Sequence, residues 1–217
     1  DLYLVNPRGI LFGPNAELDL HGAFHASTAD RLEFSNGGVF ESVPDGGTPL
    51  LSTAAPTQFG FLGPSTALIQ LYGSHLRNVN DVSLSAGTIE LAAGATISSP
   101  IDRSESGAAI TLDALWRIEF SGTDENGAGT GLDAGSRGKG RAGAIGVAAP
   151  YVELRDGAAL SVNAAGTGHS GKLTVTAGKR LTLAGHDGNG LQSRIEAQSP
   201  GSGDAGILRI DDPGVEL

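Results

Sequence analysis

The chain has 217 residues, of which 34 are glycine and 5% are aromatic, and it contains neither cysteine nor methionine. Its formal net charge of −10 excludes the basic surface with which proteins bind nucleic acid or anionic membranes. Without cysteine there is no disulfide or thiolate metal site, and no apolar run approaches the roughly 20 residues of a membrane-spanning helix.

The first part of the chain contains two turns between short apolar stretches. Asn6-Pro7 fixes an extended residue before a rigid turn, and Gly9 can adopt a positive φ. The apolar residues 10–12 then return to a core, and Pro14-Asn15 makes a second turn into the leucines at 18 and 20. Because turn residues dominate, we expect this segment to act first as a folding element.

This stretch, together with Ala26-Ser27-Thr28, resembles the secretion domain of filamentous haemagglutinin-like exoproteins, the passengers of two-partner secretion. That family carries Asn-Pro-Asn-Gly-Ile, a Phe-Gly turn and a small Ala-Ser-Thr segment. Here Arg8 stands where the family usually has the second Asn, and the family's earlier Asn-Pro motif is missing. The residues that match the secretion motif are Asn6, Pro7, Gly9, Ile10, Phe12 and Gly13.

The resemblance implies a β-helical protein that an outer-membrane two-partner transporter recognises in the periplasm and exports to the cell surface or the medium. Residues 1–81 would form the C-terminal part of the secretion domain, and residues 82–217 would continue it as further coils. The motif would mainly stabilise a turn, and direct contact between its residues and the transporter is the alternative.

From residue 82 onward, one phrase of two alternating apolar and polar triplets recurs five times. The triplets are 82–84 with 89–91, 110–112 with 118–120, 145–147 with 152–154, 173–175 with 181–183, and 208–210 with 215–217. The first triplets therefore begin 28, 35, 28 and 35 residues apart. This spacing predicts stacked coils with constant walls and corners of variable length.

Within each triplet the first and third side chains point inward, because the period is two. Third strands are expected at 95–97, 160–162 and 194–197, the first two after turns at Ala93-Gly94 and Asp156-Gly157. The pattern predicts an all-β chain that forms a three-faced parallel β-helix, right-handed by the crossover rule. One inward column should contain Val82, Ile110, Ile145, Leu173 and Leu208, and a second should contain Leu84, Leu112, Val147, Val175 and Ile210.

Both ends of the chain lie in strand pattern, at Leu2 and Leu4 and at residues 215–217. A solenoid without polar caps exposes open sheet edges. We expect a trimmed piece of a longer chain whose coils continue, with end-to-end pairing into a filament as the alternative.

Several patterns could indicate chemistry. Glu90, Glu119, Glu153 and Glu216 occupy equivalent outward positions, which would suit a cation-binding stripe or the carboxylates of a polysaccharide-cleaving β-helix. The simpler interpretation is that the neighbouring basic residues Arg117, Arg155, Lys179 and Arg180 neutralise this row.

Other polar clusters are weaker still. The corners at 123–127, 185–190 and 201–204 offer oxygen ligands but lack a calcium repeat, so flexible loops are expected. The glycine-dense run 127–146 lacks the Gly-Lys-Ser/Thr ending of a phosphate loop. The histidines are scattered at His21, His25, His75, His169 and His186. We therefore predict no catalytic residue, metal or cofactor.

The expected function is that of a secreted, non-enzymatic rod that presents its flanks for adhesion, with host or cell-surface carbohydrate or protein as candidate partners. A self-assembling extracellular filament subunit is one alternative. A polysaccharide-binding or polysaccharide-cleaving β-helix is another, and it would require outward aromatic platforms. Outside phenylalanine, the aromatic residues are only Tyr3, Tyr72, Trp116 and Tyr151.

Overall fold

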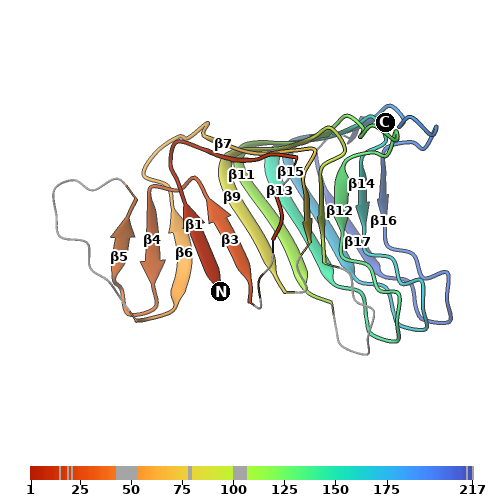
Figure 1. Cartoon of the computed structure of the whole chain (residues 1–217), viewed down its shortest axis with the longest axis horizontal. Coiled ribbons are helices and arrows are strands. Elements are labelled where there is room, and N and C mark those ends of the chain that lie inside the picture. Colours follow the sequence, from red (N-terminus) through yellow and green to blue (C-terminus); the bar gives the residue numbers. More distant parts are fainter. Residues whose placement is uncertain are drawn as a thin grey trace.

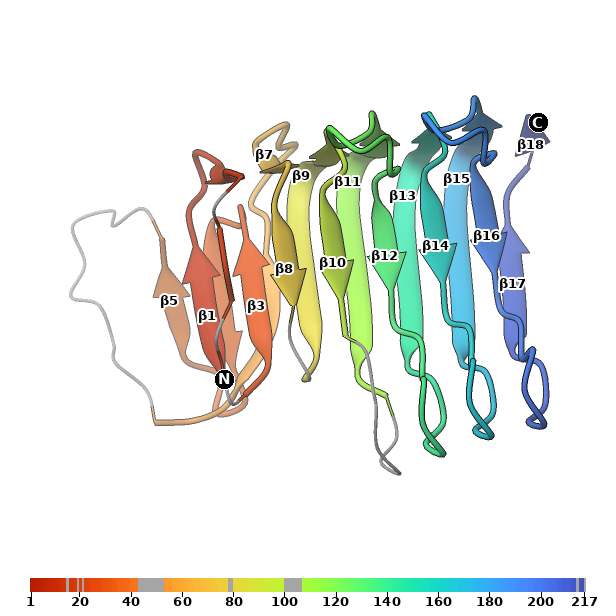
Figure 2. The same cartoon turned by 45° about the vertical axis from the view of Figure 1, so that its right-hand side comes forward.

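The computed structural model describes residues 1–14, 16–18, 20, 22–42, 53–77, 80–99, 107–213 and 215–216. These residues form strands stacked along one long axis, with the N-terminal strands at one end and the C-terminal strands at the other (Figures 1 and 2). No helix capable of crossing a membrane occurs in the part of the chain that the structure describes.

The chain winds into a right-handed parallel β-helix, as the sequence predicts. The main sheet runs in the order β1 (Leu2–Val5), β3 (Phe24–Ser27), β9 (Val82–Ala92), β11 (Ala109–Ser121), β13 (Ala144–Arg155), β15 (Lys172–Ala184) and β17 (Ile207–Asp211). Three further strands pair with the C-terminal halves of the long strands. β7 (Leu68–Tyr72) pairs with β9 and β2 (Ile10–Phe12) pairs with β7, whereas β18 (Val215–Glu216) pairs with β15.

The remaining face of the solenoid is a separate parallel sheet. Its strands in spatial order are β16 (Arg194–Glu196), β14 (Ala159–Ser161), β12 (Gly131–Asp133), β10 (Thr96–Ser98) and β8 (His75–Arg77). The sequence predicted β10, β14 and β16 to within about one residue. It did not identify β8 or β12, because their triplets are flanked by glycine and polar residues that hide the alternation.

The two triplets of each coil lie on one continuous strand rather than on two strands separated by a turn. In β9, β11, β13 and β15 the chain bends at the corner while the pairing continues on both sides, with a shift of register at the bend. Bulges of this kind let a parallel strand change direction with little loss of ladder hydrogen bonds. The prediction of separate strands was wrong for these four coils.

The inward columns are confirmed by the strand register. The column that begins at Leu2 continues through Phe24, Val82, Ile110, Ile145, Leu173 and Leu208, and the second column runs from Leu4 through Ala26, Leu84, Leu112, Val147, Val175 and Ile210. Members of the middle coils are at most 2% exposed, whereas Leu208 and Ile210 in the last coil are 45% and 40% exposed. The core is therefore a narrow column of stacked side chains that runs along the inside of the coils.

The coils alternate between two kinds, so that each position recurs 63 residues later. Val82 and Ile145 begin equivalent coils, and so do Ile110 and Leu173. Strand β11 has two residues, Leu115 and Trp116, where β9 has only Gly87. Strand β15 likewise has Gly178 and Lys179 where β13 has only one residue, Pro150.

The next corner alternates in the same way. After β9 and β13 the chain turns tightly, and Ala93 and Asp156 adopt positive φ angles of 56° and 55°. After β11 and β15 it makes a longer turn, over 122–130 and 185–193. These longer turns lie two coils apart and touch, because the N–H of Gly188 donates to the carbonyl of Gly127 at 3.0 Å.

The glycine-dense segments form stacked arms at the third corner, visible below the coils in Figure 2. Successive arms pair through their backbones, for example from the N–H of Ser136 to the carbonyl of Asn163 and from the N–H of Ser170 to that of Asp204. A Cβ at Gly168 or Gly201 would collide with the backbone of the arm before it. Glycine is needed here because the arms approach each other closely.

A small antiparallel sheet lies beyond the first coil at the N-terminal end (Figure 1). It contains β4 (Arg31–Phe34) between β5 (Val39–Glu41) and β6 (Pro56–Gly60). The chain leaves β6 through residues 61–67 and crosses the bend of β9 before entering β7. The boundary that we predict between residues 81 and 82 lies directly before β9 in the chain. In the main sheet, β9 is the neighbour of β3.

Candidate functional site

The candidate secretion motif is the connection between β1 and β2. The N–H of Gly9 donates to the carbonyl of Asn6 at 3.1 Å, and the Oδ1 atom of Asn6 accepts from the N–H of Arg8 at 3.1 Å. Asn6 therefore closes the turn with both its backbone and its side chain, as is typical of Asx turns. The N–H of Asn6 donates to the carbonyl of Ser27 at 2.9 Å, which ties the turn to β3.

Gly9 has the special backbone conformation that the sequence predicts. Its φ is +121°, a value that side-chain-bearing residues rarely adopt. A Cβ at this position would also lie 3.0 Å from the carbonyl oxygen of Leu68. Any other residue would therefore strain the turn and push β2 away from β7.

After the turn, strand β2 returns to the solenoid. Ile10 and Phe12 pack against the core, and the ring of Phe12 meets that of Phe24 edge to face at 6.1 Å between centroids. Between them Leu11 faces outward and is 67% exposed. The carbonyl of Gly13 then accepts from the N–H of Ala16 at 2.9 Å, which begins a second turn, although Asn15 lies outside the described residues.

Arg8, the departure from the family pattern, sits in a position that tolerates it. Its side chain is exposed, and the turn uses only its backbone N–H. Among the hydrogen bonds of the turn, Asn6 supplies the side-chain acceptor and position 8 supplies only a donor that every non-proline residue has. The substitution is therefore compatible with the same turn geometry.

The small residues at the end of β3 bind the motif to the following coil. The Oγ atom of Ser27 donates to the carbonyl of Ser85 at 2.8 Å and accepts from the N–H of Ala29 at 3.0 Å. The Oγ1 atom of Thr28 accepts from the N–H of Gly87 at 3.2 Å. Both hydroxyl side chains are buried, so larger residues could not replace them without opening the space between β3 and β9.

His25 stacks on Tyr3 beside the motif, with 4.4 Å between ring centroids and 15° between the planes. Burial lowers the pKa of His25, an effect that the nearby carboxylate of Asp81 partly opposes. His25 is thus held mainly as a neutral ring, which suits stacking rather than cation chemistry. His21, the other histidine predicted near this position, lies outside the described residues.

The predicted row of glutamates exists. Glu119 of β11 pairs with Glu90 of β9 and Glu153 of β13, and the register continues through Thr182 to Glu216. Parallel neighbours are about 4.8 Å apart, so unpaired carboxylates would repel one another.

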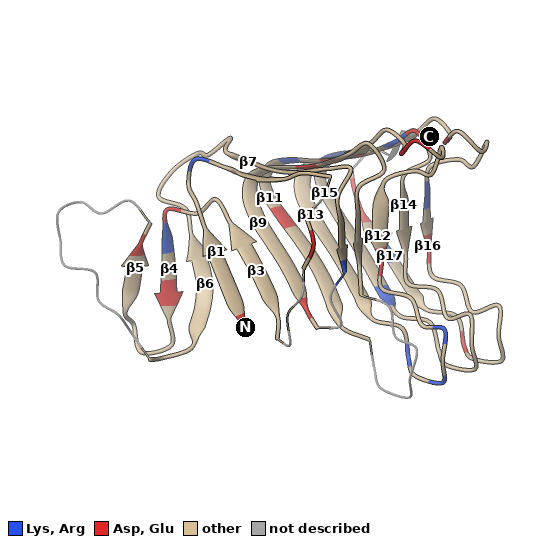
Figure 3. Ribbon diagram, in the orientation of Figure 1, with Lys and Arg blue, Asp and Glu red and all other residues tan. Residues whose placement is uncertain are grey.

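Each of the first three charges in this row has a partner. Arg117 lies 2.8 Å from Glu119, and Arg155 lies 2.9 Å from Glu153. The Nε2 atom of Gln70 donates to the glutamate of β9 at 3.2 Å. The same pairing of residues two apart occurs on β4, where Arg31 lies 2.8 Å from Glu33. In Figure 3, β4 carries one blue and one red segment with a tan segment between them. The neutralisation by Arg117 and Arg155 agrees with the simpler interpretation.

At two of the acidic corners, an aspartate side chain accepts hydrogen bonds from backbone N–H groups of its own turn. The Oδ1 atom of Asp187 accepts from the N–H groups of Asn189 and Leu191, both at 2.8 Å. Asp124 does the same one repeat earlier, and its hydrogen bond from the N–H of Ala128 is the main reason that its pKa is lowered. These two corners are Asx turns, closed by hydrogen bonds to the aspartate side chains. Within the described ranges, no three His, Asp or Glu side chains converge as a metal site would require.

Sequence reasoning missed an aromatic cluster at the bend of the main sheet. Trp116 and Tyr151 come from neighbouring coils, with 5.4 Å between ring centroids and 60° between planes. Lys179, which we expected to neutralise the glutamate row, places its Nζ atom 5.6 and 5.5 Å from the two centroids. The alternation of 28 and 35 residues was the available signal, since the longer coils carry the extra corner residues.

One of three comparisons with known proteins gives a match. A family model described as the TPS secretion domain matches residues 1–147, a span that includes the turn at Asn6, the antiparallel sheet and the coils through the first half of β13. Neither a search of curated proteins nor a search of solved structures found a match.

Proposed function

The chain belongs to the TPS secretion domain family, and from this premise we propose that the turn between β1 and β2 is the element that the outer-membrane transporter requires. Members of this family are two-partner-secreted exoproteins that reach the cell surface or the extracellular space. The proposal assigns a role to six residues, Asn6, Pro7, Gly9, Ile10, Phe12 and Gly13.

The observation that carries this proposal is that the turn is both exposed and rigidly tied to the first coils. Asn6 is exposed and fixes the turn with three hydrogen bonds, while Gly9 allows β2 to reach β7. In the described residues, β1 pairs only with β3, and β2 pairs only with β7. Their outer edges therefore offer backbone donors and acceptors to a partner that adds a strand.

The test is secretion of the full-length exoprotein that carries this domain, together with its transporter. We expect Asn6→Ala combined with Gly9→Val to abolish appearance at the cell surface or in the medium while periplasmic synthesis continues. Asn36→Ala is the matched control, because Asn36 makes the same kind of Asx turn, with its Oδ1 atom accepting from the N–H of Gly38 at 3.0 Å, in the hairpin between β4 and β5.

Normal secretion of the double variant would overturn the assignment of the motif. Circular dichroism and thermal melting of the purified variant domains separate a recognition defect from a folding defect. If the double variant folds and melts like the wild type but is not exported, the transporter reads the turn itself.

We further propose that the coils after the secretion domain serve as a stiff rod that presents its flanks for adhesion. Continuous backbone pairing between coils and a narrow apolar core support a mechanical role, because each coil is fixed by both neighbours. Binding of fluorescent rods to target surfaces, compared with a β-helix of similar length and charge, tests this role. A rod that binds no more than the control would contradict it.

A further inference from the structure

The bend between the two halves of the main sheet carries an exposed aromatic shelf, formed by Trp116, Tyr151 and Lys179. Trp116 is 51% exposed and leans toward Tyr151 on the next coil. Trp116 lies at the extra corner position of β11, and Lys179 lies at the equivalent position of β15, so both reach over the shorter bend of β13. The two-coil alternation therefore brings these three side chains together.

The shelf is cationic in a chain whose net charge is −10. The register places Arg117 and Arg180 on either side of Tyr151, directly beside Trp116 and Lys179. Arg117 is engaged with Glu119, whereas the ammonium group of Lys179 rests over the two rings. A ligand with a negative charge would find the Lys179 ammonium beside the half-exposed ring of Trp116.

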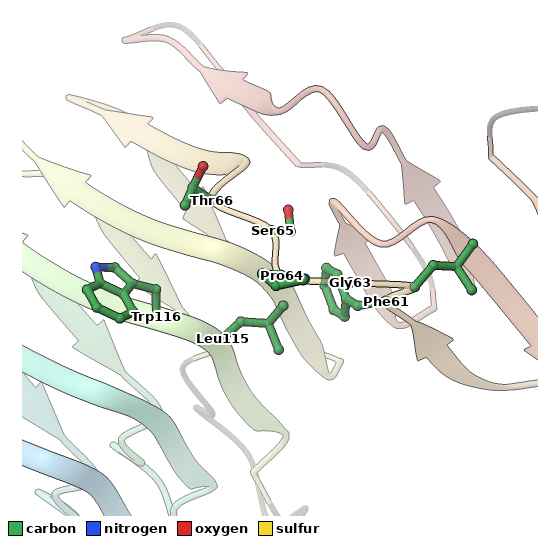
Figure 4. Close-up of a pocket in the computed structure, with 8 residues that line it drawn as sticks. Phe61, Gly63, Pro64, Ser65, Thr66, Leu115 and Trp116 are labelled. Atoms are coloured by element: carbon green, nitrogen blue, oxygen red, sulfur yellow. The ribbon is translucent and has the colours of Figure 1, made fainter.

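A hollow continues from the shelf toward the N-terminal end of the rod (Figure 4). Its volume is about 420 Å³, and it is lined by Leu115, Trp116 and residues 61–66. Leu115 and Leu62 are 43% and 65% exposed, and the segment also supplies the hydroxyl groups of Ser65 and Thr66. This size lies within the range of small-molecule sites, but the hollow is open along one side.

We propose that the shelf and hollow bind a saccharide that contains carboxylated sugar rings. The flat C–H face of a pyranose packs on Trp116, its carboxylate meets Lys179, and a neighbouring ring lies in the hollow between Leu115 and residues 61–66. Aromatic platforms bind flat, partly apolar rings, and ammonium groups form charge-assisted hydrogen bonds with carboxylates. The site needs no transporter, so it goes beyond the proposed role in secretion.

An acidic peptide fits this surface less well. Strands β11, β13 and β15 are paired on both sides immediately before and after the bend, so an extended peptide finds no continuous free strand edge there. The hollow is also open and shallow rather than a deep socket for a side-chain anchor. A saccharide needs neither feature, because stacking and side-chain contacts hold it.

The test uses the fact that Trp116 is the sole tryptophan of the chain, so its fluorescence reports directly on the shelf. The purified 217-residue chain is titrated with a galacturonic acid oligomer, with a neutral galactose oligomer of equal length, and with a glutamate oligomer. We expect saturable quenching or a spectral shift with the acidic saccharide, at least tenfold weaker binding of the neutral one, and no saturation with the peptide.

Variants then separate stacking from charge. Tyr151→Ala should weaken binding of the acidic saccharide at least fivefold, and Lys179→Gln should remove the preference for the acidic over the neutral oligomer. Tyr72→Ala is the matched control, because Tyr72 is 52% exposed but lies on β7, away from the shelf, and it should bind like the wild type. Circular dichroism confirms that each variant is folded.

Three results would overturn the proposal. These are the absence of any saturable change with the acidic saccharide, unchanged affinity in the folded Tyr151→Ala variant, or tighter binding of the glutamate oligomer than of the saccharide. Secretion of the exoprotein is measured separately, so failure here would leave the proposed role of the turn at Asn6 unaffected.

Discussion

A single inward position affects the whole stack, because each core side chain touches its counterparts in the coils before and after it. Val147 is 2% exposed and lies between Leu112 and Val175 in the second column. A charge there has no partner within the column. The cost of such a burial is far greater than that of the same change on an outward position.

We expect Val147→Asp to lower the free energy of unfolding by at least about 3 kcal/mol, or to prevent folding. Thr174→Asp is the control, since Thr174 faces outward beside Arg209 and should change stability by no more than about 0.5 kcal/mol. Denaturant unfolding followed by circular dichroism measures both. Equal losses in the two variants would contradict the inward column.

His25 makes stability depend on pH in a defined direction. Burial lowers its pKa below the usual 6.5, so the folded state favours the neutral ring while the unfolded chain still binds a proton near that pH. The stabilisation is therefore fully present above pH 6.5 and is lost as the pH falls through the folded pKa. We expect the melting temperature of the wild type to fall more than that of His25→Gln between pH 7.5 and pH 5.

The comparison with His25→Gln removes the contribution of other groups that titrate in this interval. NMR titration of the ring protons of His25 gives the folded pKa directly. Melting curves that stay parallel across the interval, or a folded pKa above 6.5, would show that the ring is not desolvated.

At this scale the sequence predicted the inward residues and the turn at Gly9 because both follow from local rules. Period-two alternation identifies Ile110 and Leu112 as inward, and a glycine after Asn-Pro predicts a positive φ. The meeting of Trp116, Tyr151 and Lys179 could not be predicted in this way. It depends on one extra residue at the bend of each longer coil. The alternating spacing indicates that residue, but the strand register is needed to show which side chains it brings together.

At the scale of elements, the segment 61–67 can cross β9 only because residue 87 of that strand is a glycine. The segment passes over the bend of β9, where the N–H of Thr88 donates to the carbonyl of Ala67 at 3.0 Å. A Cβ on Gly87 would lie 2.8 Å from the N atom of Ala67, closer than atoms pack in proteins. At the equivalent bend of β13 the residue is Pro150, a full side chain.

We expect Gly87→Ala to cost about 1–3 kcal/mol of stability and to loosen the segment, because its backbone cannot move without leaving β9. Gly146→Ala is the matched control, since its Cβ would meet only a Thr111 methyl group, at 3.9 Å. That change should be neutral or slightly stabilising. Hydrogen exchange of the amide of Thr88 should rise only in the first variant, and equal exchange in both would contradict the crossing contact.

Elements that repeat were predictable, whereas elements that occur once were not. The coils from Val82 onward can be identified from the regular spacing of their apolar triplets. The antiparallel sheet of β4, β5 and β6 has no repeat, and its strands pair across a long connection. The stacked arms were also missed, because their glycines resemble loop residues until the neighbouring arm is known to lie against them.

For the molecule as a whole, β17 presents exposed apolar side chains, and within the described residues it pairs only with β15, which leaves its other edge open. Ile207, Leu208 and Ile210 are 57%, 45% and 40% exposed on β17. An exposed strand edge with apolar neighbours favours association with another chain. We expect the isolated 217-residue polypeptide to self-associate as its concentration rises.

Sedimentation velocity across a hundredfold range of concentration measures this association. Leu208→Lys combined with Ile210→Lys should return the polypeptide to a monomer without lowering its melting temperature greatly, because both positions are already exposed. A wild-type polypeptide that remains monomeric at the highest concentration would contradict the prediction.

The contact between Gly127 and Gly188 joins long turns that lie two coils apart, so the coils must alternate between the two kinds. The long turn at 185–193 extends past the short turn of the intervening coil and contacts the long turn at 122–130. Removing a single coil, such as residues 145–172, would bring two long turns onto adjacent coils, where each occupies space that the other needs. Removing residues 82–144 would leave the alternation intact. Growth or shortening of such a rod during evolution should therefore proceed by even numbers of coils, in steps that delete or duplicate 63 residues at once.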